Sequence, residues 1–172
     1  MGTNNIYLWT GSGAGKTTSA LGVALRALGH NRKVVIIQFM KGRKNVGEYA
    51  IKRKLGKNYK IYQFGRAGWV NLNHPSNFDK MLAHKGFEFA KRIVKNVKPF
   101  LLILDEINLA IGHGLLDVRK VIHFLNSVPS STNVYLIGRH APYELRNRAD
   151  YVNEVVAVKQ PRKWKPKKGI DY

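Results

Sequence analysis

Short apolar runs and amphipathic stretches alternate along the chain. Six apolar runs, several of them rich in β-branched residues, have the pattern of buried strands. They lie at 6–9, 34–39, 60–64, 100–104, 133–137 and 151–158. Helices are expected between them, after Thr18, near 48–55, and at 82–97, 118–125 and 142–149. Strands that alternate with helices predict an α/β fold with a mostly parallel sheet and helices on both faces.

Two helices carry recognisable end signals. In the first helix, apolar residues recur at intervals of three and four, as they do on a face that packs against a core. This stripe consists of Leu21, Ala24, Leu25 and Leu28. Gly29 is expected to form the C-terminal cap of that helix, and Asp117 is expected to cap the helix at 118–125. We expect a single domain over residues 1–160 and a basic tail over 161–172 that lies outside the core.

A glycine-rich loop directly follows the first strand. Its sequence, Thr10-Gly-Ser-Gly-Ala-Gly-Lys-Thr-Thr18, approaches the phosphate-binding pattern G-x-x-x-x-G-K-[ST], with threonine at the first position. The glycines permit positive φ angles, so that successive backbone N–H groups can converge on phosphate oxygens at the start of the next helix. Lys16 adds a positive charge, and Thr17 adds a hydroxyl ligand for Mg²⁺. The pattern predicts a RecA-like P-loop sheet that contacts ATP through Gly11, Ser12, Gly13, Ala14, Gly15, Lys16, Thr17 and Thr18.

A pair of acids ends the most apolar strand. The run Phe100-Leu-Leu-Ile-Leu is followed by Asp105 and Glu106. In a parallel sheet this strand delivers its carboxylates to the edge that also carries the phosphate loop. Carboxylates in that position hold Mg²⁺ or its water ligands. We therefore assign Thr17, Asp105 and Glu106 to the metal.

The chain is strongly basic. Its 172 residues include 30 Lys and Arg against 10 Asp and Glu, which gives a formal net charge of +20. Basic residues concentrate at 41–60 and at 159–168. Such a field favours polyanions, including nucleic acid, anionic lipid and phosphorylated small molecules, but a general basic bias or solvated surface charge is the favoured explanation.

The composition also excludes several classes of protein. The absence of cysteine excludes a disulfide framework and a thiolate zinc site. No apolar window approaches the roughly 18 residues of a membrane span, and the first residues lack a signal-peptide pattern. We therefore expect a cytoplasmic protein that does not associate with a membrane.

The phosphate loop and several further segments together resemble one family, the P-loop type of ATP:corrinoid adenosyltransferase. The matching segments are 10–18, 25–30, 35–42, 47–48, 104–106, 114–117, 138–139 and 169–172. They follow the family's order over nearly the whole chain, and threonine before the first loop glycine is also a family feature. The resemblance implies transfer of the 5′-deoxyadenosyl group of ATP to Co(I) of cob(I)alamin or a cobalamin precursor, with release of triphosphate.

This chemistry needs no nucleophilic side chain, because Co(I) is itself the nucleophile, and the sequence contains no Ser/His/Asp arrangement. The protein must orient the 5′ carbon and stabilise charge on the departing triphosphate, a task that fits Lys16. The resemblance implies that Thr17 and Glu106 hold the metal with support from Asp105. An electron-donating reductase and a second copy of the chain, in a homodimer, are the expected partners.

Two of the chain's departures from the family pattern concern residues of the candidate site. Family members usually carry lysine where this chain has Ala14, so one phosphate contact is expected to be missing. The aromatic pair that the family places against the corrinoid falls on Gly68-Trp69-Val70-Asn71, which keeps one aromatic residue. We therefore assign Trp69 to the catalytic site, with core packing as the alternative.

Three further charged residues are candidates for contacts with the nucleotide. Arg26 projects from the first helix and is expected to contact phosphate or ribose. Arg139 ends a strand at the same edge of the sheet as Lys16. Glu48 stands among Lys and Arg, where it serves either substrate contact or an internal ion pair.

Two other functions share the phosphate loop and the terminal acid. A small nucleotide kinase needs a second acceptor pocket and usually a lid, for which 172 residues leave little room. A RecA-like nucleic-acid-binding ATPase is favoured by the charge and by Trp164 in the basic tail, but no pattern of base-stacking aromatic residues supports it. Nucleic acid is thus an alternative partner and the corrinoid the favoured one.

Overall fold

The computed structural model describes residues 5–68, 70–163 and 165–172 and contains one six-stranded sheet in which all paired strands are parallel. The strand order is β3-β2-β4-β5-β1-β6. The strands are β1 (Ile6–Thr10), β2 (Val34–Phe39), β3 (Tyr59–Phe64), β4 (Leu101–Asp105), β5 (Asn133–Ile137) and β6 (Tyr151–Glu154). The predicted α/β class with a parallel P-loop sheet is confirmed.

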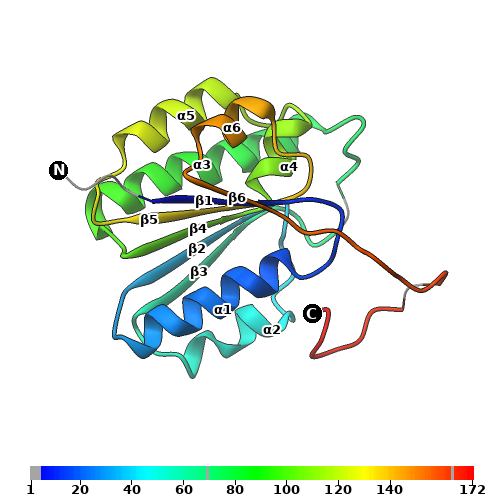
Figure 1. Cartoon of the computed structure of the whole chain (residues 1–172), viewed down its shortest axis with the longest axis horizontal. Helices are drawn as coiled ribbons and strands as arrows, with labels where there is room; N and C mark the ends of the chain where they lie inside the picture. Colours follow the sequence, from blue (N-terminus) through cyan, green and yellow to red (C-terminus); the bar gives the residue numbers. More distant parts are fainter. Residues whose placement is uncertain (1–4, 69, 164) are drawn as a thin grey trace.

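Helices cover both faces of the sheet (Figure 1). On one face lie α1 (Lys16–Gly29) and α2 (Gly47–Ala50), the second continued by a 3-10 turn at Ile51–Arg53. On the other face lie α3 (Asn77–Val97), α4 (Ile107–Gly112), α5 (Val118–Ser127) and α6 (Tyr143–Arg148). An apolar cluster lies between the sheet and each helical layer. One packs beneath α3 to α6 and the other beneath α1. None of the described helices has the length and apolar content needed to cross a membrane.

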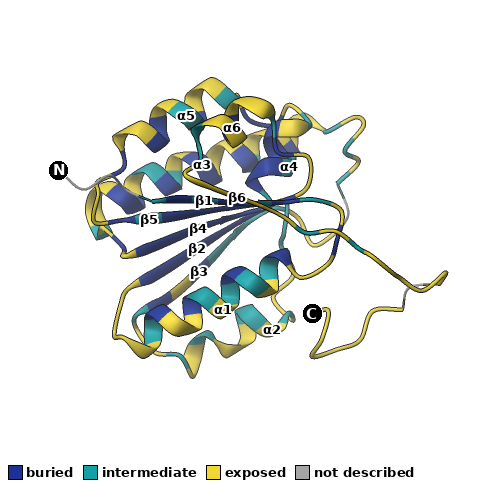
Figure 2. Ribbon diagram, viewed as in Figure 1, coloured by how far each residue is buried: buried dark blue, intermediate teal, exposed yellow. Residues whose placement is uncertain are grey.

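The strand β2 shows how the sheet divides the core. All six of its residues are buried, in agreement with its uninterrupted apolar sequence. Val35 and Ile37 join the cluster under α3, whereas Val34 and Ile36 join the cluster under α1. In Figure 2 the central strands are buried throughout, and β6 at one edge is exposed.

The first helix packs differently from the expected apolar stripe. Its buried apolar residues are Ala20, Ala24 and Ala27, whereas Leu25 is 60% exposed. Small residues on this face allow the helix to lie close to the sheet. Gly29 is the last helical residue, and the positive φ angle falls two positions later, at Asn31 (φ 56°). The expected glycine cap was therefore wrong, because asparagine also tolerates the left-handed conformation.

The other differences concern short elements. The helix α4 was not predicted, because its six residues directly follow a strand and continue its apolar character. The last strand ends at Glu154 rather than at 158, since only 151–154 pair with β1. The capping prediction at Asp117 is confirmed, and its carboxylate accepts a hydrogen bond of 2.7 Å from the amide of Arg119. The tail beyond β6 extends away from the sheet, and its end returns beside α2 (Figure 1).

Candidate active site

The phosphate loop and the acidic strand end meet at one edge of the sheet. Because all strands are parallel, the carboxyl ends of β1, β2, β4 and β5 lie along the same edge. The loop at 11–15 leaves β1 and enters α1, whose N-terminus points toward this edge. The first residue of α1 is Lys16, and the N-cap Gly15 provides no side-chain cap, so no capping side chain occupies the first amides of the helix.

The loop glycines are required by a close backbone contact. Gly11 has a φ of 99°, and a Cβ atom at this position would lie 2.4 Å from the carbonyl oxygen of Val155. The amide of Gly13 donates a 2.8 Å hydrogen bond to the same oxygen. The segment after β6 therefore fixes the path of the loop. Thr10, the residue in place of the usual glycine, is fully buried, and its hydroxyl accepts a hydrogen bond of 3.2 Å from the amide of Ala141.

Lys16 is held inside the loop. Its Nζ donates to the carbonyl oxygen of Gly11 at 2.8 Å and to that of Gly13, and only 7% of the residue is exposed. Burial and the neighbouring charge of Arg139 lower the pKa of its ammonium. The side chain is thus positioned before any phosphate arrives, which reduces the entropy lost on binding.

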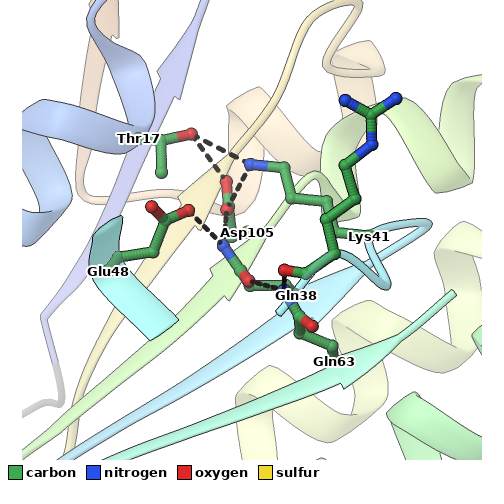
Figure 3. Close-up of polar contacts among 7 residues, drawn as sticks. Thr17, Gln38, Lys41, Glu48, Gln63 and Asp105 are labelled. Carbon is green, nitrogen blue, oxygen red and sulfur yellow. Dashed lines mark hydrogen bonds and ion pairs between the residues drawn. The ribbon is translucent and has the colours of Figure 1, made fainter. Parts of the chain in front are cut away.

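Asp105 of β4 is the centre of a polar network that includes residues of α1, α2, β2 and the loop after β2 (Figure 3). This fully buried carboxylate accepts hydrogen bonds from the Thr17 hydroxyl at 3.1 Å and from the Gln38 amide at 3.0 Å. Lys41 forms an ion pair with it, with Nζ 2.7 Å from Oδ2, and also donates to the Thr17 hydroxyl at 3.4 Å. Gln38 donates a second hydrogen bond, of 3.2 Å, to Glu48.

Glu106 combines an unusual backbone with an unsatisfied side chain. Its φ angle of 64° is left-handed, a conformation that costs a residue other than glycine about 1 kcal/mol. Among the described residues, its buried Oε2 has no hydrogen-bond partner. Burial and the adjacent Asp105 carboxylate raise the pKa of Glu106. Gly138 makes room for this side chain, because a Cβ atom there would lie 3.2 Å from Oε2. Strain, an orphaned acceptor and a raised pKa together indicate a residue placed for a ligand.

The donor set at this edge suits a magnesium ion. The described residues contain no group of three or more His, Cys, Asp or Glu side chains that could hold a metal by themselves. They do provide the hydroxyl of Thr17 and the carboxylates of Asp105 and Glu106, of which one oxygen is unsatisfied. Magnesium commonly binds through one or two carboxylates, while phosphate oxygens and water complete its shell. The residues present therefore fit the ion.

The structure brings most of the other candidates to this edge. Ser12, Ala14 and Thr18 are exposed on the loop and on the first turn of α1. Arg139 is exposed directly after Gly138, and its charge acts on the pKa values of both Lys16 and Glu106. Glu48 reaches the site through its bond to Gln38. It forms no ion pair with a basic residue in the part of the chain that the structure describes.

Arg26 is not brought to the phosphate loop. It lies in the last turn of α1, ten residues after Lys16, so the rise of an α-helix places it about 15 Å away along the axis. Its charge instead lies near the ring of Tyr135 and acts on the pKa of that phenol. The expected contact of Arg26 with phosphate or ribose stays a prediction.

Trp69 lies outside the described residues. The loop that precedes it is anchored to α3, since Arg66 forms a two-pronged ion pair with the buried Asp79 at 3.1 Å. Asp79 also completes a capping box with Ser76 at the start of α3. Residues on both sides of the nucleotide edge, among them Lys41, Glu48, Arg66, Gly68 and Tyr172, line an adjoining pocket of about 520 Å³.

Three functional candidates were missed by sequence reasoning. Lys41, Gln38 and Gln63 have no role in a general phosphate-loop pattern, yet Lys41 and Gln38 contact Asp105 directly. Gln63 donates to Gln38 at 2.9 Å and so fixes the orientation of its amide. The available signal was Gln38 itself, the single polar residue in the apolar strand Val34–Phe39. Polar residues near the carboxyl end of a buried strand are typical of a site.

Comparison with known proteins gives consistent relatives. A family model described as ATP:corrinoid adenosyltransferase BtuR/CobO/CobP matches residues 3–172. The chain is 32% identical over 171 residues to a corrinoid adenosyltransferase of Sinorhizobium sp, covering 97% of this chain and 79% of the relative. It is 31% identical over 170 residues to one of Pseudomonas aeruginosa, covering 97% and 83%. A third, from Escherichia coli K12, is 32% identical over 169 residues, covering 97% and 85%.

A solved structure supports the fold alone. The flagellar accessory protein FlaH of Methanocaldococcus jannaschii matches with a TM-score of 0.57 at 13% identity, and the match covers 89% of this chain and 71% of that chain. At this identity the match supports the arrangement of the elements and carries no conclusion about activity.

Proposed function

The chain belongs to the ATP:corrinoid adenosyltransferase family, and on that premise we propose that its loop and acidic strand end bind the triphosphate of ATP for adenosyl transfer to a corrinoid. The observation that carries this proposal is the convergence of Lys16, Thr17 and Asp105. Thr17 and Asp105 are joined by a 3.1 Å hydrogen bond, and Lys16 directly precedes Thr17 at the mouth of the loop.

The reaction forms a bond between cobalt and the 5′ carbon of ATP. The electron pair comes from Co(I) of the substrate, and the pair of the breaking carbon–oxygen bond leaves with the triphosphate. The transition state therefore gains negative charge on the phosphate side. We assign the stabilisation of that charge to Lys16, whose ammonium is held within the loop by the Gly11 carbonyl oxygen, and to the first amides of α1.

The proposal assigns three residues to the binding of magnesium. Thr17, Asp105 and Glu106 would hold the ion, which when bound adds positive charge against the leaving triphosphate. The unsatisfied Oε2 of Glu106 supports its assignment. The hydrogen bonds from Thr17 and Gln38 support a role for Asp105 that orients the site.

Lys41 has a separate role in this proposal. Its ammonium contacts both Thr17 and Asp105, the same groups that are assigned to the metal. We infer that Lys41 exchanges these contacts for a phosphate oxygen when the metal–nucleotide complex binds. Its pKa is raised, because the attraction of Asp105 and Glu106 outweighs the effect of burial, so it stays charged in either position.

The corrinoid is assigned to the pocket beside Lys41. This pocket of about 520 Å³ opens next to the loop that leads to Trp69, so a corrinoid bound there would meet the nucleotide edge. The aromatic contact from Trp69 remains a prediction, as do the reductase partner, the homodimer and the cytoplasmic location.

Absorbance spectroscopy tests the proposed function. Chemically reduced cob(I)alamin should convert to the adenosylated form only when the protein, ATP and Mg²⁺ are all present, and omission of any one should abolish the change. ATP hydrolysis with no spectral conversion would instead indicate an ATPase.

A further inference from the structure

A basic groove runs along the face of the molecule that carries α3 and α5. The second half of α3 and the length of α5 enclose a hollow of about 820 Å³. Its floor is apolar and rigid, because Val94 and Phe124 are buried and Phe124 packs edge-on against Phe87 with ring centroids 5.5 Å apart. The α5 helix has ten residues, so the groove is about 15 Å long.

The walls of this groove carry cations and no carboxylate. The lining residues with basic side chains are Lys91, Lys95, Lys98, Arg119, Lys120 and His123. The remaining lining residues are apolar or hydroxylic, and none is Asp or Glu. Within the described chain, Lys91 alone of these lysines and arginines forms an ion pair, an exposed one of 2.6 Å with Glu88. Four cations are therefore left without an acidic partner along one short hollow.

Helix stability explains only part of this charge. Lys95 and Lys98 lie at the C-terminal end of α3, where a cation interacts favourably with the helix dipole. Arg119 and Lys120 lie in the first turn of α5, where a cation is unfavourable by about 0.3–1 kcal/mol, and no acid occupies that turn. Asp117 caps the helix through the amide of Arg119 and does not line the groove. Helix stability therefore does not explain the positions of Arg119 and Lys120, whereas a bound anion would favour them.

The lining chemistry selects one class of anion. No exposed Phe, Tyr or Trp lines the groove, and its one exposed ring is the imidazole of His123, so it offers little surface on which successive nucleic-acid bases could stack. Its length and the row of cations on each wall match a linear chain of phosphates. We propose that this groove binds a condensed phosphate, such as tripolyphosphate, at a site separate from the nucleotide site.

The two sites lie on different faces of the sheet. The phosphate loop enters α1, whereas α3 and α5 cover the opposite face (Figure 1). Along α3 the groove is lined by residues near the end that precedes β4, and along α5 it runs from Arg119 in the first turn to Ser127 at the end of the helix. Binding in the groove should therefore not require Lys16 and should not compete with ATP at the loop.

Calorimetry with tripolyphosphate tests this proposal on the full chain. In a Lys16→Ala background, which weakens the loop site, one tripolyphosphate should still bind per chain. Adding Lys95→Gln, Arg119→Gln and Lys120→Gln should weaken that binding at least tenfold. Because counterions are released from each neutralised contact, the affinity should also fall steeply with salt. The same triple variant in the Lys16 chain should retain adenosyl transfer.

A matched variant separates a site from general charge. Lys54 and Lys57 are exposed residues between the 3-10 turn and β3, Lys60 is an exposed residue of β3, and their replacement by Gln likewise removes three positive charges. This control should change the affinity less than about threefold. Equal losses in the two triple variants, or binding of a single-stranded oligonucleotide tighter than that of tripolyphosphate, would overturn the proposal.

Discussion

The ammonium of Lys41 lies 2.7 Å from the buried carboxylate of Asp105 and forms the only ion pair at the nucleotide edge among the described residues. It also reaches the hydroxyl of Thr17. One side chain thus contacts two of the three groups assigned to magnesium, so the lysine and the ion compete for the same oxygens.

This competition predicts the effect of removing the charge. Lys41→Met should increase the affinity of the nucleotide-free protein for Mn²⁺, used as a paramagnetic probe, by several-fold. The variant should also lose about 1–2 kcal/mol of unfolding free energy, because Asp105 stays buried without its partner. Electron paramagnetic resonance and thermal unfolding measure the two effects, and Lys41→Arg is the control that keeps the charge. Unchanged Mn²⁺ affinity in Lys41→Met would show that the lysine does not occupy the metal position.

The carboxylate of Glu106, which is assigned to the metal, should lower the stability of the metal-free protein. Its folded pKa lies above the ordinary value of 4.5, because burial and Asp105 disfavour the charged form. The unfolded chain therefore releases this proton first as pH rises, and stability falls through the interval up to the folded pKa. Glu106→Gln removes this cost, so the metal-free variant should be more stable than wild type at pH 8, with a difference that shrinks toward pH 4.5 and below.

Urea unfolding at several pH values measures this difference. Glu88→Gln is the control, since Glu88 is exposed and its ion pair with Lys91 contributes little, so a change below about 0.5 kcal/mol is expected. A Glu106→Gln variant that is less stable than wild type at pH 8 would contradict this prediction. It would mean that interactions in the folded protein compensate for burial of the Glu106 charge.

The sheet could be predicted closely because its strands are buried on both faces. The apolar runs at 34–39 and 133–137 match β2 and β5 residue for residue. The edge strand β6 was predicted four residues too long. Its pairing with β1 stops at Glu154, whereas the apolar character of the sequence continues beyond that residue. The sequence pattern also did not predict that α1 packs through alanines. The predicted stripe consisted mainly of leucines, because leucine is the more apolar residue.

The site could be predicted where it depends on one local segment. The phosphate loop and the acids after β4 follow directly from short sequences. The contacts of Lys41 depend on how the loop after β2 folds over β4, which no local pattern states. The position of Arg26 near the far end of α1 follows from helix geometry, and its expected contact with phosphate or ribose stays a prediction.

Lys16 should be required for transfer and not for folding. Lys16→Ala removes the charge and the loop hydrogen bonds, so kcat/KM for adenosyl transfer should fall at least about 100-fold. Circular dichroism should show an unchanged fold, and Lys60→Ala, an exposed lysine of β3, should keep full activity. An active Lys16→Ala variant with normal ATP affinity would contradict the assignment of this loop as the phosphate site.

Trp69 should affect the corrinoid more than the nucleotide. If its ring lies against the corrinoid, Trp69→Ala lowers turnover with prereduced corrinoid while ATP affinity stays unchanged. Asn71→Trp should raise turnover by restoring a second aromatic face. Rates for Trp69→Ala within about twofold of wild type, a loss under roughly 0.5 kcal/mol, would make Trp69 a packing residue.

The most direct test of the central claim is the identity of the phosphate product. Attack at the 5′ carbon makes the whole phosphate chain the leaving group, whereas a kinase or an ATPase breaks the terminal bond. Phosphorus NMR of a turnover mixture with ATP, Mg²⁺ and cob(I)alamin should show intact triphosphate, formed in equal amount with the adenosylated corrinoid. Orthophosphate released steadily without corrinoid, with no triphosphate, would contradict the account.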